Sequence, residues 1–195
     1  DIKNLKQNNT AKKGDVLLLT KKIGVGILTT AEKKNLLKEG DKTLAAEQMM
    51  QLNKIGAIMG KIDGVNAMTD VTGFGLLGHL IELAEGSGLS AVVDFSKVPL
   101  ISDRLVDYVE MGAVPGGTNR NWDSYGHKVS MVNSSAASLH KNILADPQTS
   151  GGLLISVSKE SLNEVVAILN EGGLSDRTTP IGELTNAGSF AVTVI

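Results

Sequence analysis

The stretch VNAMTDVTGFGLLGHL, residues 65–80, decides how this chain folds. Its first residues predict a strand over 65–69, and Phe74, Leu77 and Leu80 recur with the spacing of a helix. The glycines at the junction of the two segments predict a tight turn. A strand, a glycine turn and a helix in this order are typical of a sheet that is covered by helices.

Strands are expected on both sides of this stretch. Short apolar runs predict them over residues 16–20, 91–93, 151–157, 181–184 and 190–195. The last two strands are expected to form a hairpin through Asn186 and Gly188.

Helices are expected between these strands. Amphipathic stripes predict helices over residues 43–60, 74–86, 105–109 and 162–172. The spacing of Thr29 and Glu32 is that of a capping box and predicts one more short helix. Residues 112–129 are expected to be a long loop. The fold class is therefore α+β, a layered α/β sandwich in which helices pack on a mixed sheet.

The composition limits the chemistry that the chain can support. It has 195 residues, 42% of them hydrophobic, a formal net charge of −2 and no cysteine. A cysteine nucleophile, a disulfide and a thiolate zinc site are therefore excluded within it. The charge gives no reason to expect nucleic acid or an anionic membrane as a partner, and aromatic residues, at 3%, are too few for base-stacking platforms.

The chain is expected to be one domain with a connector in front of it. Residues 1–14 are polar and rich in Lys, Asn and Gln, and they do not start with Met. They predict a connector from a preceding domain, and residues 15–195 predict a single globular domain. No apolar run approaches the roughly 20 residues of a membrane span, so we expect a cytoplasmic protein.

Asp70 is the most informative candidate for chemistry. It follows a predicted strand and precedes a glycine turn, which is where α/β sheets place ligands. A carboxylate at this place could hold Mg²⁺, which takes one or two protein carboxylates and fills its shell with water and phosphate oxygens. The alternative is that Asp70 or Thr72 caps the following helix. No GxxxxGK[ST] motif occurs, so a P-loop is excluded.

Three further clusters have both a functional and a structural interpretation. Gly24-Val25-Gly26 is either a plain turn or a close approach of backbone to a ligand. Residues 118–121, with Arg120, could bind an anion or form a solvated loop. Residues 146–152 (DPQTSGG) could line a site or form a turn. The histidines at positions 79, 127 and 140 lack zinc spacing and are expected to be packed or on the surface.

Several motifs in one order are specific in combination. They are the segment 19–33, the block 67–79, the segment 112–121 and the segment 146–152. In this order they resemble the carboxyl-terminal half of the selenophosphate synthetase (selenide, water dikinase) family, in the aminoimidazole ribonucleotide synthetase (PurM-like) superfamily. The resemblance covers about residues 11–195. It departs at Ala145, where many relatives have a Cys that is not the nucleophile.

The resemblance implies an activity and a set of roles. The family makes selenophosphate from selenide and ATP, releases AMP and phosphate, and works with Mg²⁺ as a homodimer. Its amino-terminal half carries the nucleophile, the catalytic Lys and most ATP contacts, so the present chain by itself is expected to be inactive. Asp70 matches the metal-binding Asp of the second domain. Weaker matches, to substrate or phosphate contacts, are Thr72, Gly73, Asn119, Arg120, Gln148 and Thr149.

Two other functions remain open at this point. The chain could be a non-catalytic binding or dimerisation module with the same fold. It could also belong to a related ATP-dependent enzyme such as a thiamine monophosphate kinase or a hydrogenase maturation protein. The pattern around residues 116–121 favours selenophosphate synthetase over these relatives.

Overall fold

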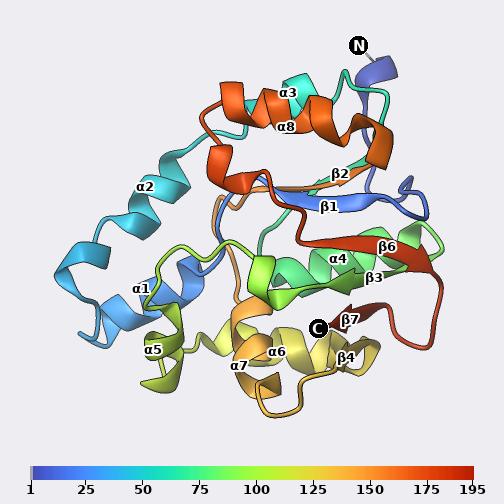
Figure 1. Cartoon of the computed structure of the whole chain (residues 1–195). Helices are drawn as coiled ribbons and strands as arrows, with labels where there is room; N and C mark the ends of the chain where they lie inside the picture. Colours follow the sequence, from blue (N-terminus) through green and yellow to red (C-terminus); the bar gives the residue numbers. More distant parts are fainter. Residues whose placement is uncertain (1) are drawn as a thin grey trace.

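The computed structural model describes residues 2–195, which form one mixed sheet of seven strands (Figure 1). The strands are β1 (Val16–Leu19), β2 (Val65–Asp70), β3 (Leu89–Val93), β4 (Val129–Met131), β5 (Leu153–Val157), β6 (Gly182–Asn186) and β7 (Val192–Val194). They lie in the order β2-β5-β1-β6-β3-β7-β4. Neighbours from β2 to β3 are antiparallel, and β7 is parallel to both β3 and β4. The expected mixed sheet is confirmed.

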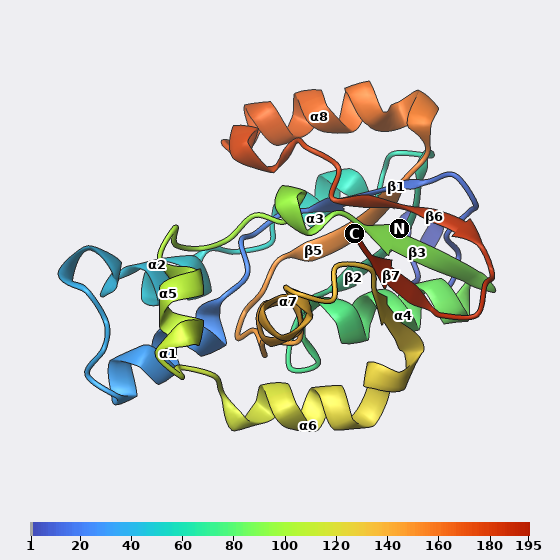
Figure 2. The same ribbon diagram turned by 60° about the horizontal axis from the view of Figure 1, so that its bottom comes forward.

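Helices cover the sheet. They are α1 (Val25–Lys33), α2 (Leu44–Met50), α3 (Ile55–Met59), α4 (Gly75–Gly86), α5 (Leu105–Glu110), α6 (Gly116–Tyr125), α7 (Ala137–Leu144) and α8 (Leu162–Glu171). Short 3-10 helices cover Ile2–Asn4, Glu39–Asp41, Phe95–Lys97, Gly126–Lys128, Lys159–Ser161 and Ser175–Arg177. Figure 2 shows α8 on one side of the sheet and α4, α6 and α7 on the other. None of the helices in this described part combines the length and apolar character that crossing a membrane requires.

The two halves of the sheet differ in how they are covered. All four residues of β1 are buried, and they alternate between two cores, with Leu17 in the larger core and Leu18 in the core under α8. In β6, by contrast, Leu184 is buried in the larger core whereas Glu183 is exposed. A strand with helices on both faces is apolar throughout, and a strand with one solvent face alternates. β1 is therefore apolar throughout because both of its faces are covered.

The predicted helix over residues 43–60 is interrupted. α2 ends at Met50 and α3 begins at Ile55. The connection bonds to distant backbone, because Asn53 Nδ2 donates to the carbonyl of Gly151 at 2.9 Å and Lys21 Nζ donates to that of Gln51 at 2.8 Å. These tertiary contacts outweigh the local helical pattern.

The predicted long loop over 112–129 is also wrong, because it contains α6 and the start of β4. Thr118, Asn121 and Tyr125 are the buried residues of α6, and they are spaced three and four apart. Two of these are polar, and two glycines start the helix, so hydrophobic periodicity does not reveal it. The α7 helix was likewise not predicted.

Two smaller expectations are also corrected. α1 begins at Val25 rather than after Thr29, whose hydroxyl donates to the carbonyl of Gly26 inside the helix at 3.1 Å. The last two strands do not form a hairpin, since β6 and β7 lie on opposite sides of β3. Placing β7 parallel to β3 extends the sheet and gives β4 a partner.

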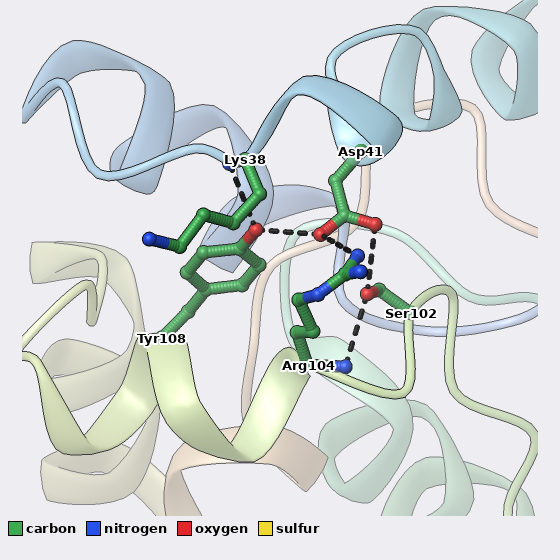
Figure 3. A network of polar contacts seen from close by, with 5 residues as sticks. All are labelled: Lys38, Asp41, Ser102, Arg104 and Tyr108. Atoms are coloured by element: carbon green, nitrogen blue, oxygen red, sulfur yellow. Dashed lines mark hydrogen bonds and ion pairs between the residues drawn. The ribbon is translucent and has the colours of Figure 1, made fainter.

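A buried carboxylate joins α5 to the segment before α2 (Figure 3). Asp41 is 3% exposed, and it accepts hydrogen bonds from Tyr108 at 2.5 Å, Ser102 at 3.0 Å and Arg104 at 3.2 Å. Burial alone would raise the pKa of Asp41, but these three donors together lower it. The hydroxyl of Tyr108 also accepts from the backbone N–H of Lys38 at 3.0 Å. The network is complete within the protein and fixes α5.

Candidate functional site

Four segments meet at the end of the sheet where β1 and β2 finish. The chain leaves β1 and reaches the start of α1 through residues 20–24, and it leaves β2 and enters α4 through residues 71–74. The N-terminus of α6, at Gly116, and residues 145–152 are the other two. Because β5 runs antiparallel to β1 and β2, its first residue lies beside the last residue of β2. Motifs that are up to about 130 residues apart in the sequence therefore share one place.

Asp70 lies at this edge as the last residue of β2, paired with Leu153. Its side chain is exposed, and in the described part of the chain its carboxylate takes part in no hydrogen bond or ion pair. The N-cap of α4 is Phe74, without a side-chain cap. Neither Asp70 nor Thr72 therefore caps the helix, and the structural alternative for Asp70 is removed.

One face of α6 holds the loop that follows Asp70. The Asn121 side chain donates to the carbonyl of Gly73 at 2.8 Å and to that of Ala145 at 3.0 Å. Tyr125, four residues later on the same face, donates its hydroxyl to the carbonyl of Phe74 at 2.6 Å. Both donors are buried, and burial strongly raises the pKa of Tyr125, so its hydroxyl stays protonated. The loop backbone is thus fixed by hydrogen bonds to the carbonyls of two consecutive residues.

Gly75 closes this loop in a conformation that other residues avoid. Its φ is +70°, and a Cβ on it would lie 2.8 Å from the carbonyl carbon of Ala145. The carbonyl of Thr72 accepts from the backbone N–H of Gly75 and from that of Gln148, both at 3.0 Å. The 70–75 loop and the 145–148 segment are therefore one rigid unit.

Thr72 directs its half-buried side chain at His79, one turn into α4. Thr72 Oγ1 lies 3.1 Å from His79 Nε2. The imidazole is 8% exposed, which agrees with the expectation of a packed histidine. Its other nitrogen, Nδ1, lies 3.3 Å from Glu82 Oε2, in electrostatic contact but outside the geometry of a hydrogen bond.

Gln148 caps α1 from inside the protein. Its Oε1 accepts from the backbone N–H groups of Gly24 and Val25 at 3.1 and 3.2 Å. Its Nε2 donates to the backbone carbonyl of Asp146 at 2.7 Å and to the Asp146 carboxylate at 2.8 Å. Gly24-Val25-Gly26 is therefore a capped helix start, and not the plain turn of the structural interpretation. The side chain of Gln148 is fully occupied by internal partners.

Asp146 is the second carboxylate of this region, and it has no exposed surface. Its Oδ2 accepts from the backbone N–H of Gly26 at 3.0 Å, whereas its Oδ1 has no partner among residues 2–195. A Cβ on Gly26 would collide with this carboxylate, which explains the glycine. Burial raises the pKa of Asp146 to about 7, although the hydrogen bonds from Gln148 and Gly26, and the nearby backbone N–H of Ile27, act to lower it.

The residues after Gln148 return to the surface. Thr149 and Ser150 are exposed, and Ser150 has a φ of +50° in the left-handed region. A Cβ on Gly151 would collide with the carbonyl of Val71, so the segment passes directly against the start of the Asp70 loop. The buried Lys21 Nζ donates to the carbonyl of Ser150 at 2.5 Å, and burial lowers its pKa. Thr149 thus projects from a well-held backbone.

Asn119 and Arg120 are exposed in the first two turns of α6. A Cβ on Gly117, at the start of this helix, would lie 2.7 Å from Pro147 Cγ, so α6 begins against the 146–152 segment. The sequence pattern predicts an anion site over 118–121 and phosphate contacts for the two exposed residues, but it does not predict the internal contacts that Asn121 makes. The available signal was that Asn121 lies three residues after Thr118 and four before Tyr125, on one helix face.

The arrangement fits one half of a metal site. In the part of the chain that the structure describes, no group of three or more His, Asp or Glu side chains could hold a metal ion. An exposed, unpartnered carboxylate at Asp70 on a fixed backbone is the donor that Mg²⁺ takes from one protein segment. The exposed guanidinium of Arg120 and the exposed Thr149 add groups that recognise anions.

The family of the chain follows from its sequence. Residues 12–195 match the family described as "AIR synthase related protein, C-terminal domain", and the chain belongs to this family. It is 53% identical over 193 residues to a selenide, water dikinase of Pseudomonas putida, covering 99% of this chain and 54% of that protein. To the selenide, water dikinase of Aeromonas hydrophila subsp. hydrophila it is 54% identical over 180 residues, covering 92% and 50%. The chain spans about half the length of the curated relatives it matches.

Solved structures show the same fold at lower identity. A hydrogenase maturation protein HypE in complex with ATP matches with a TM-score of 0.65 at 17% identity, over 97% of this chain and 49% of that one. A thiamine-monophosphate kinase from Stenotrophomonas maltophilia matches with a TM-score of 0.64 at 13% identity, over 97% and 52%. The PurM-like α+β fold is thereby confirmed.

Proposed function

We propose that this chain is the carboxyl-terminal domain of a selenide, water dikinase, which makes selenophosphate from selenide and ATP with release of AMP and phosphate. The proposal is supported by the sequence identity of this chain to two such enzymes, 53% and 54%. The observation that carries it is Asp70, an exposed carboxylate without a partner in the described chain, on a loop that α6 and Gln148 hold in place. A residue kept rigid yet uncommitted is organised for a ligand.

We assign roles to the residues of this chain accordingly. Asp70 would hold Mg²⁺, which when bound neutralises charge that develops on phosphate oxygens. Arg120 and Asn119 would contact phosphate oxygens from α6, and Thr149 would do so from the opposite segment. Thr72 and Gly73 would contact the substrate or its phosphates from the loop that follows Asp70.

Gln148 receives a different role within the same site. Because its side chain is fully bonded inside the protein, we propose that it serves the substrate by holding the loop and α1, with only its backbone near the ligand. This keeps Gln148 in the site and removes its side chain from direct recognition.

The remaining parts of the reaction would come from outside this chain. A single exposed carboxylate cannot organise the metal, so we propose that the amino-terminal half supplies the other carboxylates, the nucleophile and the catalytic lysine. The partners are then ATP, selenide, that amino-terminal domain and a second copy in a homodimer, in the cytoplasm. Neither nucleic acid nor a membrane surface is part of the proposal.

The test is Asp70→Asn in the full-length enzyme. The amide keeps the size of the side chain but removes the charge that Mg²⁺ needs, so we expect selenide-dependent AMP formation to fall at least tenfold at limiting Mg²⁺. Direct titration of Mn²⁺, followed by electron paramagnetic resonance with a non-hydrolysable ATP analogue, should show weaker binding.

Asp63→Asn is the matched control, because Asp63 is an exposed carboxylate before the opposite end of β2. It should leave both measurements at wild-type values. Wild-type Mn²⁺ affinity and turnover in Asp70→Asn would show that Asp70 does not hold the metal.

A further inference from the structure

The contact between Thr72 and His79 joins a half-buried hydroxyl of the candidate site to a buried imidazole. The two atoms, Thr72 Oγ1 and His79 Nε2, are 3.1 Å apart. His79 is also restrained by the ring of Phe74, whose centroid lies 5.9 Å away at a tilt of 54°. The imidazole therefore has one orientation relative to the loop that carries Asp70.

The surroundings of His79 favour a hydrogen on one of its two ring nitrogens. Nδ1 faces the Glu82 carboxylate at 3.3 Å, and a carboxylate favours a hydrogen on the nitrogen it faces. In the neutral ring Nε2 is then the acceptor. With the hydrogen on Nδ1, the Thr72 hydroxyl donates its only hydrogen to His79 Nε2, which leaves its oxygen lone pairs for a second partner.

A hydroxyl held in this way recognises one class of ligand. With its hydrogen engaged, Thr72 Oγ1 can accept a hydrogen bond but cannot give one to a phosphate oxygen. A water molecule in the shell of a bound cation is a strong donor, whereas a phosphate oxygen is only an acceptor. Thr72 lies two residues after Asp70, on the same fixed loop.

We propose that His79 is a positioning residue that orients the Thr72 hydroxyl to accept from the hydration shell of the divalent cation held by Asp70. The inference rests on the proposed function and deepens it, because it assigns Thr72 to the hydrated metal rather than to phosphate. His79 itself touches neither metal nor substrate. Its effect passes entirely through Thr72.

A double-mutant cycle in the full-length enzyme tests this route. Thr72→Val removes the hydroxyl at nearly constant shape, and His79→Leu removes the acceptor. Each should weaken Mn²⁺ binding in the presence of a non-hydrolysable ATP analogue about fivefold, the size of one ordinary hydrogen bond. The double variant should bind Mn²⁺ no more weakly than Thr72→Val alone, since His79 has nothing to orient without the hydroxyl.

The conservative variants and a control separate positioning from stability. Thr72→Ser and His79→Gln keep a hydroxyl and an acceptor, so each should recover most of the Mn²⁺ affinity. His127→Leu changes an exposed histidine outside the site and should have wild-type affinity. At saturating Mg²⁺ the kcat of His79→Leu should return to near the wild-type value, because only metal affinity is lost.

Histidine-selective ¹⁵N NMR of the wild-type enzyme adds a readout that does not depend on a variant's folding. The His79 signals, assigned by their loss in His79→Gln, should show the tautomer with hydrogen on Nδ1. A hydrogen on Nε2, additive effects in the cycle, or unchanged Mn²⁺ affinity in His79→Leu would each overturn the inference. Such a result together with a loss of Mn²⁺ binding in Asp70→Asn would leave the proposed function standing, whereas wild-type binding in Asp70→Asn would overturn both.

Discussion

Asp70 and Asp146 lie in segments that meet at the same edge of the sheet, yet the two carboxylates have opposite surroundings. Asp70 is exposed and bonds to nothing in the described chain, whereas Asp146 has no exposed surface and bonds to Gly26 and Gln148. Burial of a charged group is costly unless donors compensate it, so a buried carboxylate serves the fold. A carboxylate that stays at the surface is accessible to a ligand. Residue type therefore does not distinguish the two roles, but burial does.

The sharpest test of this contrast is the pH dependence of stability. Because the folded-state pKa of Asp146 is raised to about 7 from a usual value of 3.8, the folded chain keeps a proton that the unfolded chain loses between these pH values. The free energy of unfolding should therefore fall as pH rises from about 4 to about 7 and level off above. The expected loss is about 4 kcal/mol, because one pKa unit corresponds to about 1.4 kcal/mol.

Urea unfolding of the full-length protein and its Asp146→Asn variant measures this loss. The unfolding free energy of wild type, measured relative to that of Asp146→Asn, should fall as the pH rises over that range. Asp70→Asn should follow the wild-type curve. A difference between wild type and Asp146→Asn that stays constant from pH 4 to pH 8 would show that Asp146 is ionised in the folded protein.

Gln148 supports the buried side of the comparison. Gln148→Leu has similar volume but leaves the N–H groups of Gly24 and Val25 without a partner and leaves Asp146 Oδ2 with the N–H of Gly26 alone. We expect a loss of about 3 kcal/mol in unfolding free energy, since each orphaned buried group costs about 1–3 kcal/mol. Thr149→Ala, at the exposed neighbour, should stay within about 0.5 kcal/mol of wild type in the same urea titration. Equal unfolding free energies of Gln148→Leu and Thr149→Ala would contradict the role of Gln148 as the cap of α1.

Local patterns were sufficient for the exposed side of the comparison. The strands β1 and β2, and the placement of Asp70 at a strand end beside glycines, follow from a few consecutive residues. The buried side depends on contacts across the chain. Gln148 bonds to Gly24, 124 residues away, and no spacing in the sequence encodes that pairing.

The missed helix α6 has the same explanation. Its first residues, Gly116 and Gly117, are poor helix formers, and its buried face is mostly polar. What holds it is packing of Gly117 on Pro147 and the bonds from Asn121 and Tyr125 to carbonyls of the Asp70 loop. Hydrophobic periodicity cannot predict a helix that is stabilised by tertiary hydrogen bonds rather than by an apolar stripe.

Arg120 gives the smallest expected effect on folding and completes the comparison on the exposed side. Its side chain is exposed on α6, so Arg120→Ala should change the unfolding free energy by less than about 0.5 kcal/mol. In the full-length enzyme the same variant should raise the KM for ATP about tenfold, the size of one charge-assisted hydrogen bond to phosphate. Arg120→Lys should recover only part of the affinity, because an ammonium group lacks the planar fork of guanidinium.

Lys33→Ala, which removes an exposed cation at the far end of α1, is the matched control and should leave the KM for ATP unchanged. Steady-state kinetics with ATP and selenide as the varied substrates measure KM and kcat. A wild-type KM for ATP in Arg120→Ala would remove Arg120 from the site while leaving Asp70 in it.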